Sequence, residues 1–387
     1  MNQLTFDPAN DGRWEQYDQL ATRAYGHPIG DITHLREHAD LQVAVRGGRV
    51  VAGGLGLLVD QFFGGAPVPS ACLGDGCVAP EERGEHLATD MTAARLRPLP
   101  ERGAVISTIS TSSTGYARRL GWEAPTHVLA WAVATDDLQR CFAAEDFEVE
   151  HGLTDEAEVL QRDLARQWNG PVHRPTWWTR WKQDKDNLTT YRFARPGHPT
   201  ADLLSLTTKR HERHGTSLTV HDFWAAGQPA AAMLAFLARH NTRARTITFR
   251  RGALPPYPTL LHGLRHHRIT AEAWHPWMLR ILDIPEAIRL RGWPADLTTA
   301  VPIEIESEDG DRGRWMLQIK AGAAEIVLTR VRGQVTFTRR QLAIWYAGGY
   351  RSTTSARMAG VHAVSEKALA ILVHSTTQFE PWLPDHF

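Results

Sequence analysis

The stretch CVAPEERGEHLA, residues 77–88, lies between an apolar run that begins near Cys72 and a segment, Leu87–Leu96, whose apolar residues recur with helical spacing. This pattern predicts a strand, a turn and the start of a helix. Backbone N–H groups converge at a helix N-terminus, where the helix dipole also favours negative charge, and Arg83 adds a positive side chain. The segment therefore indicates an anion-binding turn, although ordinary α/β cores contain the same order of elements without a ligand.

The segments around this turn predict the rest of a first α/β core. Residues 41–58 contain two apolar runs around Gly47-Gly48, which is typical of a β-hairpin with a tight turn. A strand-like run follows the helix at Ala104–Ile109, and THVLAWAV at residues 126–133 predicts one more strand. We expect the first core to end with that strand.

Two further units follow along the chain. An acidic, helical stretch at Asp136–Gly170 leads into a second alternation of strands and helices at Thr189–Ile284. After Pro294, short strand-like runs with turn signals at Asp309-Gly310 and Ala321-Gly322 predict a smaller unit that ends in helices. We therefore predict a mixed α/β fold with domains at residues 1–135, 136–296 and 297–387.

Composition excludes several classes of protein. The 387 residues contain 43 basic and 43 acidic side chains, so no overall charge draws the chain to nucleic acid or to an anionic membrane. The N-terminal stretch is polar, no apolar run is long enough to cross a bilayer, and the three cysteines fit neither a disulfide framework nor a zinc site. We expect a cytoplasmic protein. Its 14 tryptophans are expected in packing rather than in a ligand cage.

A second motif lies downstream of the predicted turn. GYARRLGW, residues 115–122, follows the pattern Y-x-x-x-[LF]-G-[WYF], and the two motifs together resemble the catalytic half of the GNAT acetyltransferase superfamily. The resemblance implies that residues 77–88 hold the pyrophosphate of acetyl-CoA and that Tyr116 is the general acid that protonates the departing thiolate. A phenol suits this step because it is protonated at neutral pH. The alternative for Tyr116 is a half-buried tyrosine that caps a helix.

The expected contacts with acetyl-CoA follow from the same match. In the loop they are Cys77, Val78, Arg83, Gly84, Glu85, His86, Leu87 and Ala88, and Thr111 is expected to line the floor of the pocket. The amides near the end of the strand are expected to polarise the thioester carbonyl, so that the amine attacks it directly without a covalent enzyme intermediate.

The loop departs from the GNAT pattern Q/R-x-x-G-x-G/A at one position. With Arg83 as its first residue, His86 stands where the central glycine belongs, and Ala88 satisfies the last position. Glycine lets the backbone approach phosphate closely, whereas a Cβ hinders that approach. Two hypotheses stay open: His86 points away and the amides still hold pyrophosphate, or the loop has lost acetyl-CoA. The three glutamates around Arg83 modestly favour the second hypothesis.

Three ordered matches narrow the resemblance to the Eis-like acetyltransferases. Residues 274–288 resemble the end of their second GNAT-like domain, and residues 313–317 and 342–350 resemble their sterol-carrier-protein-like domain. The resemblance implies two GNAT-like domains with mixed sheets, followed by that third domain, and a hexamer. It also implies acetyl transfer from acetyl-CoA to an amine of a small cationic molecule, such as an aminoglycoside or a polyamine, or to lysine.

The sequence ends in FEPWLPDHF, residues 379–387. Eis-like proteins end in a phenylalanine whose α-carboxylate turns back into the catalytic domain and acts through water as general base, so the resemblance implies this role for Phe387. A carboxylate held nearby can accept the proton that an ammonium substrate must lose before it attacks. The alternative is a frayed terminus, but Trp382 and Leu383 are apolar enough to pack. Asp385 and Asp31 are candidates to attract cationic groups at the entrance.

Other clusters give weaker signals. His211 and His214, like His266 and His267, lie among arginines and match no metal-binding spacing, so we expect solvated surface there and no metal site. Residues 110–114 lack the G-x-S-x-G pattern of a serine hydrolase.

Three hypotheses for the function follow. The first is an Eis-like N-acetyltransferase that takes a small-molecule amine and assembles as a homo-oligomer. The second is a GNAT-fold enzyme of specialised metabolism that has lost acetyl-CoA use and employs Tyr116 and the Phe387 carboxylate for other acid–base chemistry. The third is a protein that only binds a small molecule, in pockets rich in tryptophan.

Overall fold

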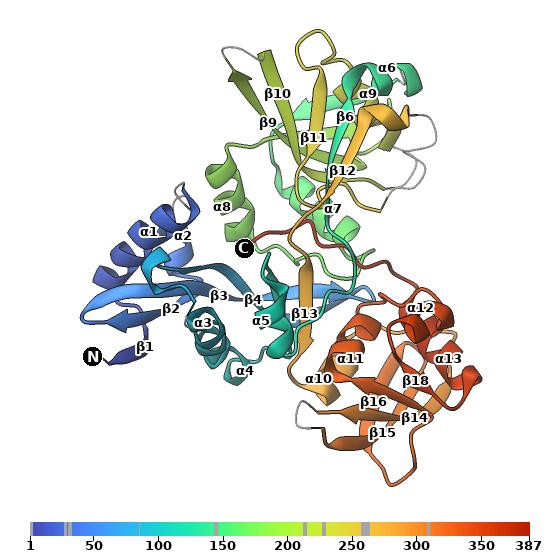
Figure 1. Cartoon of the computed structure of the whole chain (residues 1–387). Coiled ribbons are helices and arrows are strands. Elements are labelled where there is room, and N and C mark those ends of the chain that lie inside the picture. The colour runs from blue at the N-terminus through green and yellow to red at the C-terminus, as the bar shows by residue number, and fades with distance from the viewer. Residues whose placement is uncertain are drawn as a thin grey trace. The chain divides into compact units, whose positions relative to one another are not determined.

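The computed structural model separates into two compact units (Figure 1). It describes residues 3–26, 29, 33–84, 86–142, 146–211, 215–226, 230–256, 264–307 and 310–387. Unit 1 consists of Met1–Thr126, Pro276–Pro381 and His386–Phe387, and unit 2 consists of His127–His275 and Trp382–Asp385. Three sheets form the framework, and each of them mixes parallel and antiparallel pairs, which confirms the predicted α/β fold class.

The first sheet belongs to unit 1 and has the strand order β1-β2-β3-β4-β5-β13. Its strands are β1 (Leu4–Pro8), β2 (Ala39–Arg46), β3 (Arg49–Phe63), β4 (Ala66–Val78), β5 (Ile106–Ser110) and β13 (Trp277–Ile281). Neighbouring strands are antiparallel except for β4 and β5, which run parallel. Gly47 and Gly48, both with positive φ, join β2 to β3, so the predicted hairpin is confirmed.

Helices cover both faces of this sheet (Figure 1). They are α1 (Asp11–Tyr25), α2 (Thr33–Arg36), α3 (Leu87–Leu96), α4 (Pro98–Glu101) and α5 (Thr114–Arg119), with a 3-10 turn at Pro80–Glu82. A Cβ added at Gly53 of β3 would meet Tyr17 of α1, whereas one at the next residue, Gly54, would meet Arg95 of α3. Because successive side chains of a strand point to opposite faces, α1 and α3 cover opposite faces of the sheet.

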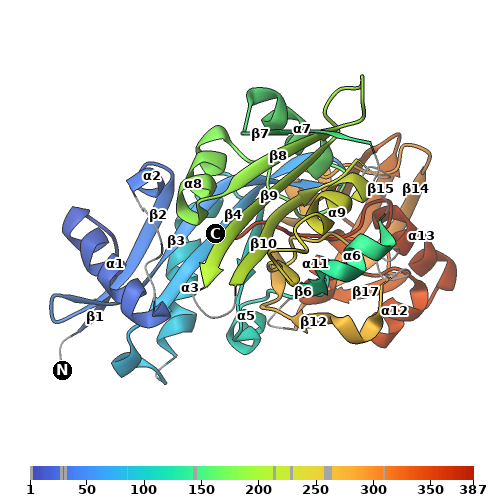
Figure 2. The ribbon, with the colours of Figure 1, turned by 90° about the horizontal axis from the view of Figure 1, so that it is seen from above.

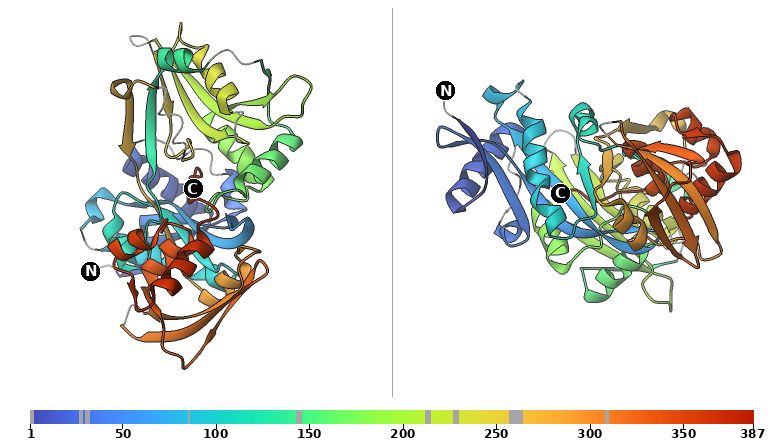
Figure 3. Two further views of the ribbon diagram at one scale, coloured as in Figure 1. Left: turned by 90° about the vertical axis from the view of Figure 1, so that its right-hand side faces the viewer. Right: turned by 90° about the horizontal axis from the view of Figure 1, so that it is seen from below.

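A second sheet in unit 1 has the strand order β16-β15-β14-β17-β18. Its strands are β14 (Thr299–Glu306), β15 (Arg312–Lys320), β16 (Ala323–Leu328), β17 (Val335–Thr338) and β18 (His362–Ala363), and the accompanying helices are α10 (Ile284–Leu290), α11 (Arg339–Tyr346), α12 (Thr353–Met358) and α13 (Glu366–Thr376). Helices α11 and α13 pack on each other beside this sheet (Figure 3). Ala321 and Gly322 form the predicted turn between β15 and β16, whereas Asp309 of the other predicted turn lies outside the described residues.

The sheet of unit 2 has the strand order β12-β6-β11-β10-β9-β8-β7. Its strands are β6 (Leu129–Ala134), β7 (Glu148–His151), β8 (Thr189–Ala194), β9 (Asp202–His211), β10 (Gly215–Trp224), β11 (Thr246–Phe249) and β12 (Ile269–Ala273). Its helices are α6 (Thr135–Cys141), α7 (Asp155–Ala165), α8 (Thr176–Asp186) and α9 (Ala230–Ala238), with a 3-10 turn at His266–Arg268. Figure 2 shows β8, β9 and β10 side by side, and α9 supplies Met233 to the core beneath them.

Two strands lie in the opposite sheet from the one that the sequence pattern predicted. Strand β6, expected to close the first core, pairs with β11 and β12 in unit 2. Strand β13, expected to end the second domain, pairs with β5 in unit 1, with Trp277 opposite Ser110. The pattern identified β6 as a strand but not its partners, because alternation specifies a face and not a neighbour. For β13 only the resemblance of residues 274–288 to the end of a second GNAT-like domain was available. The domain limits at 135/136 and 296/297 stay a proposal, with β6 belonging to the sheet of unit 2 and β13 to the sheet of unit 1.

None of the helices in the described ranges combines the length and the apolar character that crossing a bilayer requires.

Candidate active site

The candidate site is built around an irregularity near the end of β4. Opposite β3 the register runs Gly53 to Cys77 and then Leu55 to Gly74, so β4 bulges at Asp75-Gly76. Asp75 has a φ of 42°, a left-handed conformation that a residue with a Cβ rarely adopts. A bulge of this kind re-aims the backbone groups of a strand, and it is common beside functional sites.

Three successive carbonyls of the bulge accept hydrogen bonds from side chains. Arg95 of α3 donates to Gly74, Tyr17 of α1 donates to Asp75 at 2.6 Å, and Tyr25 of α1 donates to Gly76 at 2.7 Å. Arg95 also donates twice to the carbonyl of Leu55 on β3 and is buried. Because a trans peptide holds C=O and the next N–H in opposite directions, these donors fix the direction of the following amides. The bulge is therefore a rigid, oriented row of peptide groups.

Strand β4 also stops pairing with its neighbour β5 just before the bulge. The parallel ladder between β4 and β5 runs from Ser70 opposite Ile106 to Leu73 opposite Ile109. Beyond Leu73 the strand continues to Val78 with ladder pairs to β3 only. The β5 side of the bulge is thus where a ligand can reach the backbone of β4.

Burial governs the protonation of the polar side chains at the bulge. Burial raises the pKa of Tyr17 and of Tyr25 well above the usual value, and the Asp75 carboxylate raises both further, so both phenols remain hydrogen-bond donors. Burial likewise raises the pKa of the Cys77 thiol to about 12, although Arg95 and Arg83 oppose this change. Cys77 is therefore a neutral thiol at physiological pH.

Tyr116 and Thr111 come from the chain segment after β5. Thr111 is buried directly beyond the strand, and its Oγ1 accepts a hydrogen bond from the amide of Ser113 at 3.1 Å. Tyr116 lies half-buried on α5, against the apolar cluster that contains Trp122. Burial and Asp75 are the main causes of the raised pKa of Tyr25, and the Tyr116 phenol makes a small contribution in the same direction.

Phe387 reaches the same bulge in unit 1. A Cβ added at Gly74 would overlap the carboxyl carbon and carbonyl oxygen of Phe387, so the end of the chain lies directly on this glycine. Phe387 itself is half-buried rather than frayed. The predicted carboxylate therefore lies at the bulge of β4, and the predicted acid, Tyr116, lies on α5, the helix that follows β5.

The loop after β4 has the expected strand–turn–helix form. His86 is the N-cap of α3, with a φ of 61° and an exposed side chain, and Gly84 has a φ of 98°. Leu87 is buried in the core beneath α3, whereas Ala88 is exposed. Glu85 lies outside the described residues. The left-handed backbone at His86 explains why a glycine suits this position, since a Cβ there costs about 1 kcal/mol.

The charges of the loop are arranged more favourably for an anion than the sequence indicated. Glu81 pairs with Arg23 of α1 at 3.2 Å, and Glu82 pairs with Arg46 of β2 at 2.6 Å. These arginines offset the two carboxylates beside Arg83. Arg83 is exposed and close enough to Cys77 to influence its pKa. The concern that acidic neighbours weaken the loop as an anion site is thereby reduced.

Several other predicted residues do not join this site. Asp385, a candidate for attracting cationic groups, is fully buried in ion pairs, which corrects that expectation, and Asp31 lies outside the described residues. A cavity of about 770 Å³ in unit 1 is lined by residues such as Leu96 and Trp122 and by none of the predicted site residues.

The histidine clusters give no metal centre in the part of the chain that is described, where no three His, Cys, Asp or Glu side chains converge. His211 forms a hydrogen bond with Ser217 at the surface, and His267 is exposed. Neither His214 nor the side chain of His266 belongs to the described part.

Sequence analysis missed the donors that hold the bulge, Tyr17, Tyr25 and Arg95. The available signal was Gly74-Asp75-Gly76, because glycines inside an apolar strand pattern indicate a bulge or a close backbone approach. No pattern along the chain pairs a helical tyrosine with a carbonyl 58 residues away.

Three models of known protein families match successive stretches of the chain. Residues 5–124 match a model of an acetyltransferase (GNAT) domain, and residues 170–281 match a second model of such a domain. Residues 284–384 match a model of a sterol carrier protein domain.

Relatives and solved structures share this organisation from end to end. The chain is 23% identical to an uncharacterized N-acetyltransferase of Streptomyces griseus over 99% of both chains, and 23% identical to one of Streptomyces avermitilis over 97% of both. A GCN5-related N-acetyltransferase structure from Anabaena variabilis superposes with a TM-score of 0.85 at 22% identity, covering all of both chains. The structure of Eis1 from Mycobacterium abscessus gives a TM-score of 0.75 at 17% identity, again over all of both chains.

The fold and the matched domains define a tandem GNAT protein with a sterol carrier protein domain. The chain belongs to the GNAT acetyltransferase superfamily and has the Eis-like architecture, as the resemblance implied. The predicted enzyme class, an N-acyltransferase, is confirmed at the level of this family.

Replacing Arg95 tests whether its hydrogen bonds hold the bulge. We expect Arg95→Met to lower the free energy of unfolding by about 2 to 4 kcal/mol, because charged hydrogen bonds are lost and buried carbonyls lose their donor. Urea denaturation measures this change. Arg97→Met, at the exposed C-cap position directly after α3, is the matched control and should stay within about 0.5 kcal/mol of wild type. A loss below about 1 kcal/mol for Arg95→Met would contradict the role of this side chain.

The raised pKa of Cys77 predicts an unreactive thiol. With a pKa of about 12, only about one thiol in 10⁴ is ionised at pH 8, so a disulfide reagent should modify half-buried Cys141 well before Cys77. Peptide mass mapping after timed labelling checks this order. Cys77→Ala should also retain turnover within about twofold, because a neutral buried thiol is a poor nucleophile. Labelling of Cys77 as fast as Cys141 would show that the thiol is activated.

Proposed function

We propose that this protein transfers an acetyl group from acetyl-CoA to a primary amine of a small cationic molecule or of lysine. The observation that carries the proposal is the bulge of β4, where the Phe387 carboxyl group lies on Gly74 beside peptide groups that Tyr17 and Tyr25 hold, with Tyr116 on α5, the helix that follows β5. A general base, a general acid and donors for a developing oxyanion are what direct amine acylation requires.

The loop before α3 suits the pyrophosphate of acetyl-CoA. The first turn of α3 begins at Leu87, and the amides of Leu87 and Ala88 have no acceptor within the helix, whereas that of Thr89 donates to the carbonyl of His86. Amides without an intrahelical acceptor suit anionic oxygens. The exposed side chain of His86 supports the hypothesis that the imidazole points away from these amides. Arg83 supplies a positive charge that the neighbouring ion pairs do not use up.

The reaction then follows from the positions of the groups. The Phe387 carboxylate accepts a proton from the ammonium group through water, and the free amine attacks the thioester carbonyl. Bulge amides held by Tyr17 and Tyr25 stabilise the negative oxygen, and its collapse expels the CoA thiolate, which Tyr116 protonates. The acylated nitrogen then gives its surplus proton to the Tyr116 phenolate, which restores the acid. An amide and free CoA are the products. The neutral Cys77 thiol supports direct transfer without an acyl-enzyme.

A cationic acceptor fits the carboxylates at the site. Asp75 is half-buried at the bulge, and the α-carboxylate of Phe387 adds a second negative group in unit 1. Opposite charges draw an ammonium group toward the thioester before it is deprotonated. We keep aminoglycosides, polyamines and lysine as the acceptor classes to test, together with a hexameric assembly and a cytoplasmic location.

Replacing Tyr116 by phenylalanine tests the general acid. We expect kcat for acetyl transfer to fall about 10²-fold or more while the KM for acetyl-CoA stays within about twofold, because only the proton donor is removed. Release of free CoA with polyamine and aminoglycoside acceptors measures turnover, and calorimetry measures acetyl-CoA binding. Tyr191→Phe, at a half-buried position in unit 2, is the matched control. If Tyr116→Phe keeps its kcat within about threefold, another group protonates the thiolate.

Replacing His86 tests the altered position of the loop. We expect His86→Gly to tighten acetyl-CoA binding several-fold and to stabilise the fold by about 1 kcal/mol, because glycine adopts the left-handed backbone without strain. His86→Ala removes the imidazole but keeps the strained Cβ, so it separates the two causes. Absence of acetyl-CoA binding in wild type, with recovery only in His86→Gly, would instead support a protein that has abandoned this cosubstrate.

A further inference from the structure

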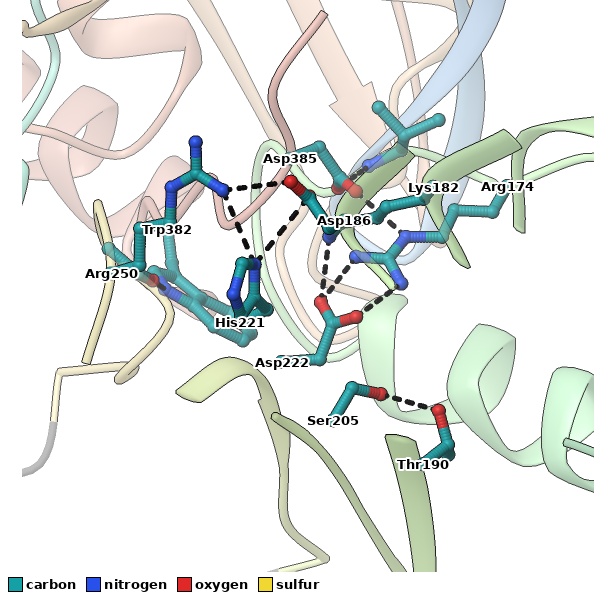
Figure 4. Close-up of polar contacts among 12 residues, drawn as sticks. Arg174, Lys182, Asp186, Thr190, Ser205, His221, Asp222, Arg250, Trp382 and Asp385 are labelled. Atoms are coloured by element: carbon teal, nitrogen blue, oxygen red, sulfur yellow. Dashed lines mark hydrogen bonds and ion pairs between the residues drawn. The ribbon is translucent and has the colours of Figure 1, made fainter. Parts of the chain in front are cut away.

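Two buried carboxylates of unit 2 show how a negative charge is held in its interior (Figure 4). Asp222 accepts hydrogen bonds from Arg174 at 3.2 and 2.7 Å and from Lys182 at 2.9 Å. Asp385 accepts one from Arg174 at 2.7 Å and one from the amide of Val172 at 2.9 Å. Each oxygen of these two side chains therefore has a donor, as a buried charge requires.

A further buried carboxylate of unit 2, that of Asp202 at the start of β9, is satisfied on one side only. Asp202 is 1% exposed. Its Oδ1 accepts a hydrogen bond from the amide of Ala226 at 2.8 Å, whereas its buried Oδ2 has no hydrogen-bond partner in the described part of the chain. A buried polar atom without a partner is costly, and proteins usually satisfy such an atom with water, an ion or a ligand.

The charge of Asp202 decides which kind of donor suits the open oxygen. Burial raises the pKa of Asp202 to about 6, although the Ala226 amide and the Arg195 guanidinium oppose this change. The side chain is therefore ionised in most molecules at neutral pH. A positively charged donor forms the strongest hydrogen bond with a carboxylate, so a cation is the best partner for Oδ2.

Asp202 forms part of the wall of a cavity of about 550 Å³ that lies wholly in unit 2. The lining comes from the segment before β7, from the connection between β8 and β9, and from α9. Most of the described lining is apolar, namely Phe147, Phe193, Pro196, Pro199, Ala201 and Ala232. A mostly apolar cavity of this size with a few polar groups is typical of a site for a small molecule.

Two rings and two rim charges complete the cavity. The rings of Phe147 and Phe193 lie 5.7 Å apart between centroids, and both pack in the core of unit 2, so they offer an apolar body a fixed surface. Asp146 and Arg195 are exposed at the rim, where solvent screens their opposite charges. The buried carboxylate of Asp202 therefore determines the sign of charge that the interior favours.

We propose that this cavity binds an apolar primary amine, whose ammonium group donates to Oδ2 of Asp202 and whose aromatic or alkyl body lies against Phe147 and Phe193. The inference goes beyond the proposed function, because all its residues belong to unit 2 and it involves no acetyl transfer. Binding of the amine gives the open carboxylate oxygen the cationic donor that Asp222 already has in Arg174 and Lys182.

Three probes test the chemical class of the ligand on the wild-type chain without acetyl-CoA. The first, 2-phenylethylamine, carries a ring and an ammonium group, whereas 2-phenylethanol lacks the charge and ethylamine lacks the ring. Saturation-transfer NMR titrations measure the three dissociation constants. We expect 2-phenylethylamine to bind about 10-fold more tightly or better than either of the others. Equal affinity for 2-phenylethylamine and 2-phenylethanol, or no binding of the amine, would overturn the proposal.

An acid-to-amide change tests whether the amine binds at this cavity. Asp202→Asn keeps an acceptor for the Ala226 amide but loses the charge, so we expect the affinity for 2-phenylethylamine to fall about 10-fold or more. Asp163→Asn removes an exposed carboxylate of α7, outside the cavity, and this matched control should stay within about twofold of wild type. Wild-type affinity in Asp202→Asn would place the amine elsewhere and refute the assignment.

A second variant covers the case in which Asp202→Asn fails to fold, which circular dichroism detects. Phe147→Ala removes a half-buried ring from the wall and leaves every carboxylate in place, so the affinity for 2-phenylethylamine should fall about fivefold or more. An unchanged affinity in Phe147→Ala would also count against the site. Since none of these titrations measures acetyl transfer, their outcome is independent of the proposed function.

Discussion

Arg95, Tyr17 and Tyr25 donate hydrogen bonds to three successive carbonyls of β4, and the candidate site depends on these bonds. A strand that bulges at a residue with positive φ would otherwise leave peptide groups unsatisfied beneath two helices. The donors come from α1 and α3, which cover opposite faces, so the sheet and both helices must be in place before the bulge is rigid. Oriented amides stabilise a developing charge without reorganising, which is the property that an acyl-transfer site needs.

Much of the fold and part of the site were predictable from the sequence, because they depend on local pattern. The β2–β3 hairpin follows from Gly47-Gly48, and α3 follows from the spacing of Leu87 and its apolar successors. Resemblance named Tyr116 and Phe387, and the structure places Phe387 on the bulge and Tyr116 on α5. What the sequence could not supply depends on partners far along the chain: which sheet receives β6, and which side chains satisfy a carbonyl. Burial of Asp385 was missed for the same reason, since an acidic residue in a polar terminus gives no sign of a buried arginine.

The buried charges of unit 2 and the bulge of unit 1 follow one physical rule. In both places a polar group that water cannot reach is matched by donors and acceptors of fixed geometry. Such networks are costly to leave half satisfied, and this cost favours a single arrangement of the groups that they join. Buried Arg95 binds backbone carbonyls of β3 and β4 in unit 1, and buried Arg174 binds the carboxylates of Asp222 and Asp385 in unit 2.

The exchange of β6 and β13 between the two sheets bears on how such a protein can be divided. A fragment cut after the first GNAT match would retain β5 without its neighbour β13, so one edge of its sheet would be unpaired. A fragment that began there would pair β6 with β11, but its β13 would have no partner strand. The sheet of the first GNAT match thus takes its edge strand, β13, from the second GNAT stretch of the sequence. Recombination between genes would therefore have to inherit both GNAT segments together, so the tandem pair, rather than the single domain, is the unit that evolution can shuffle.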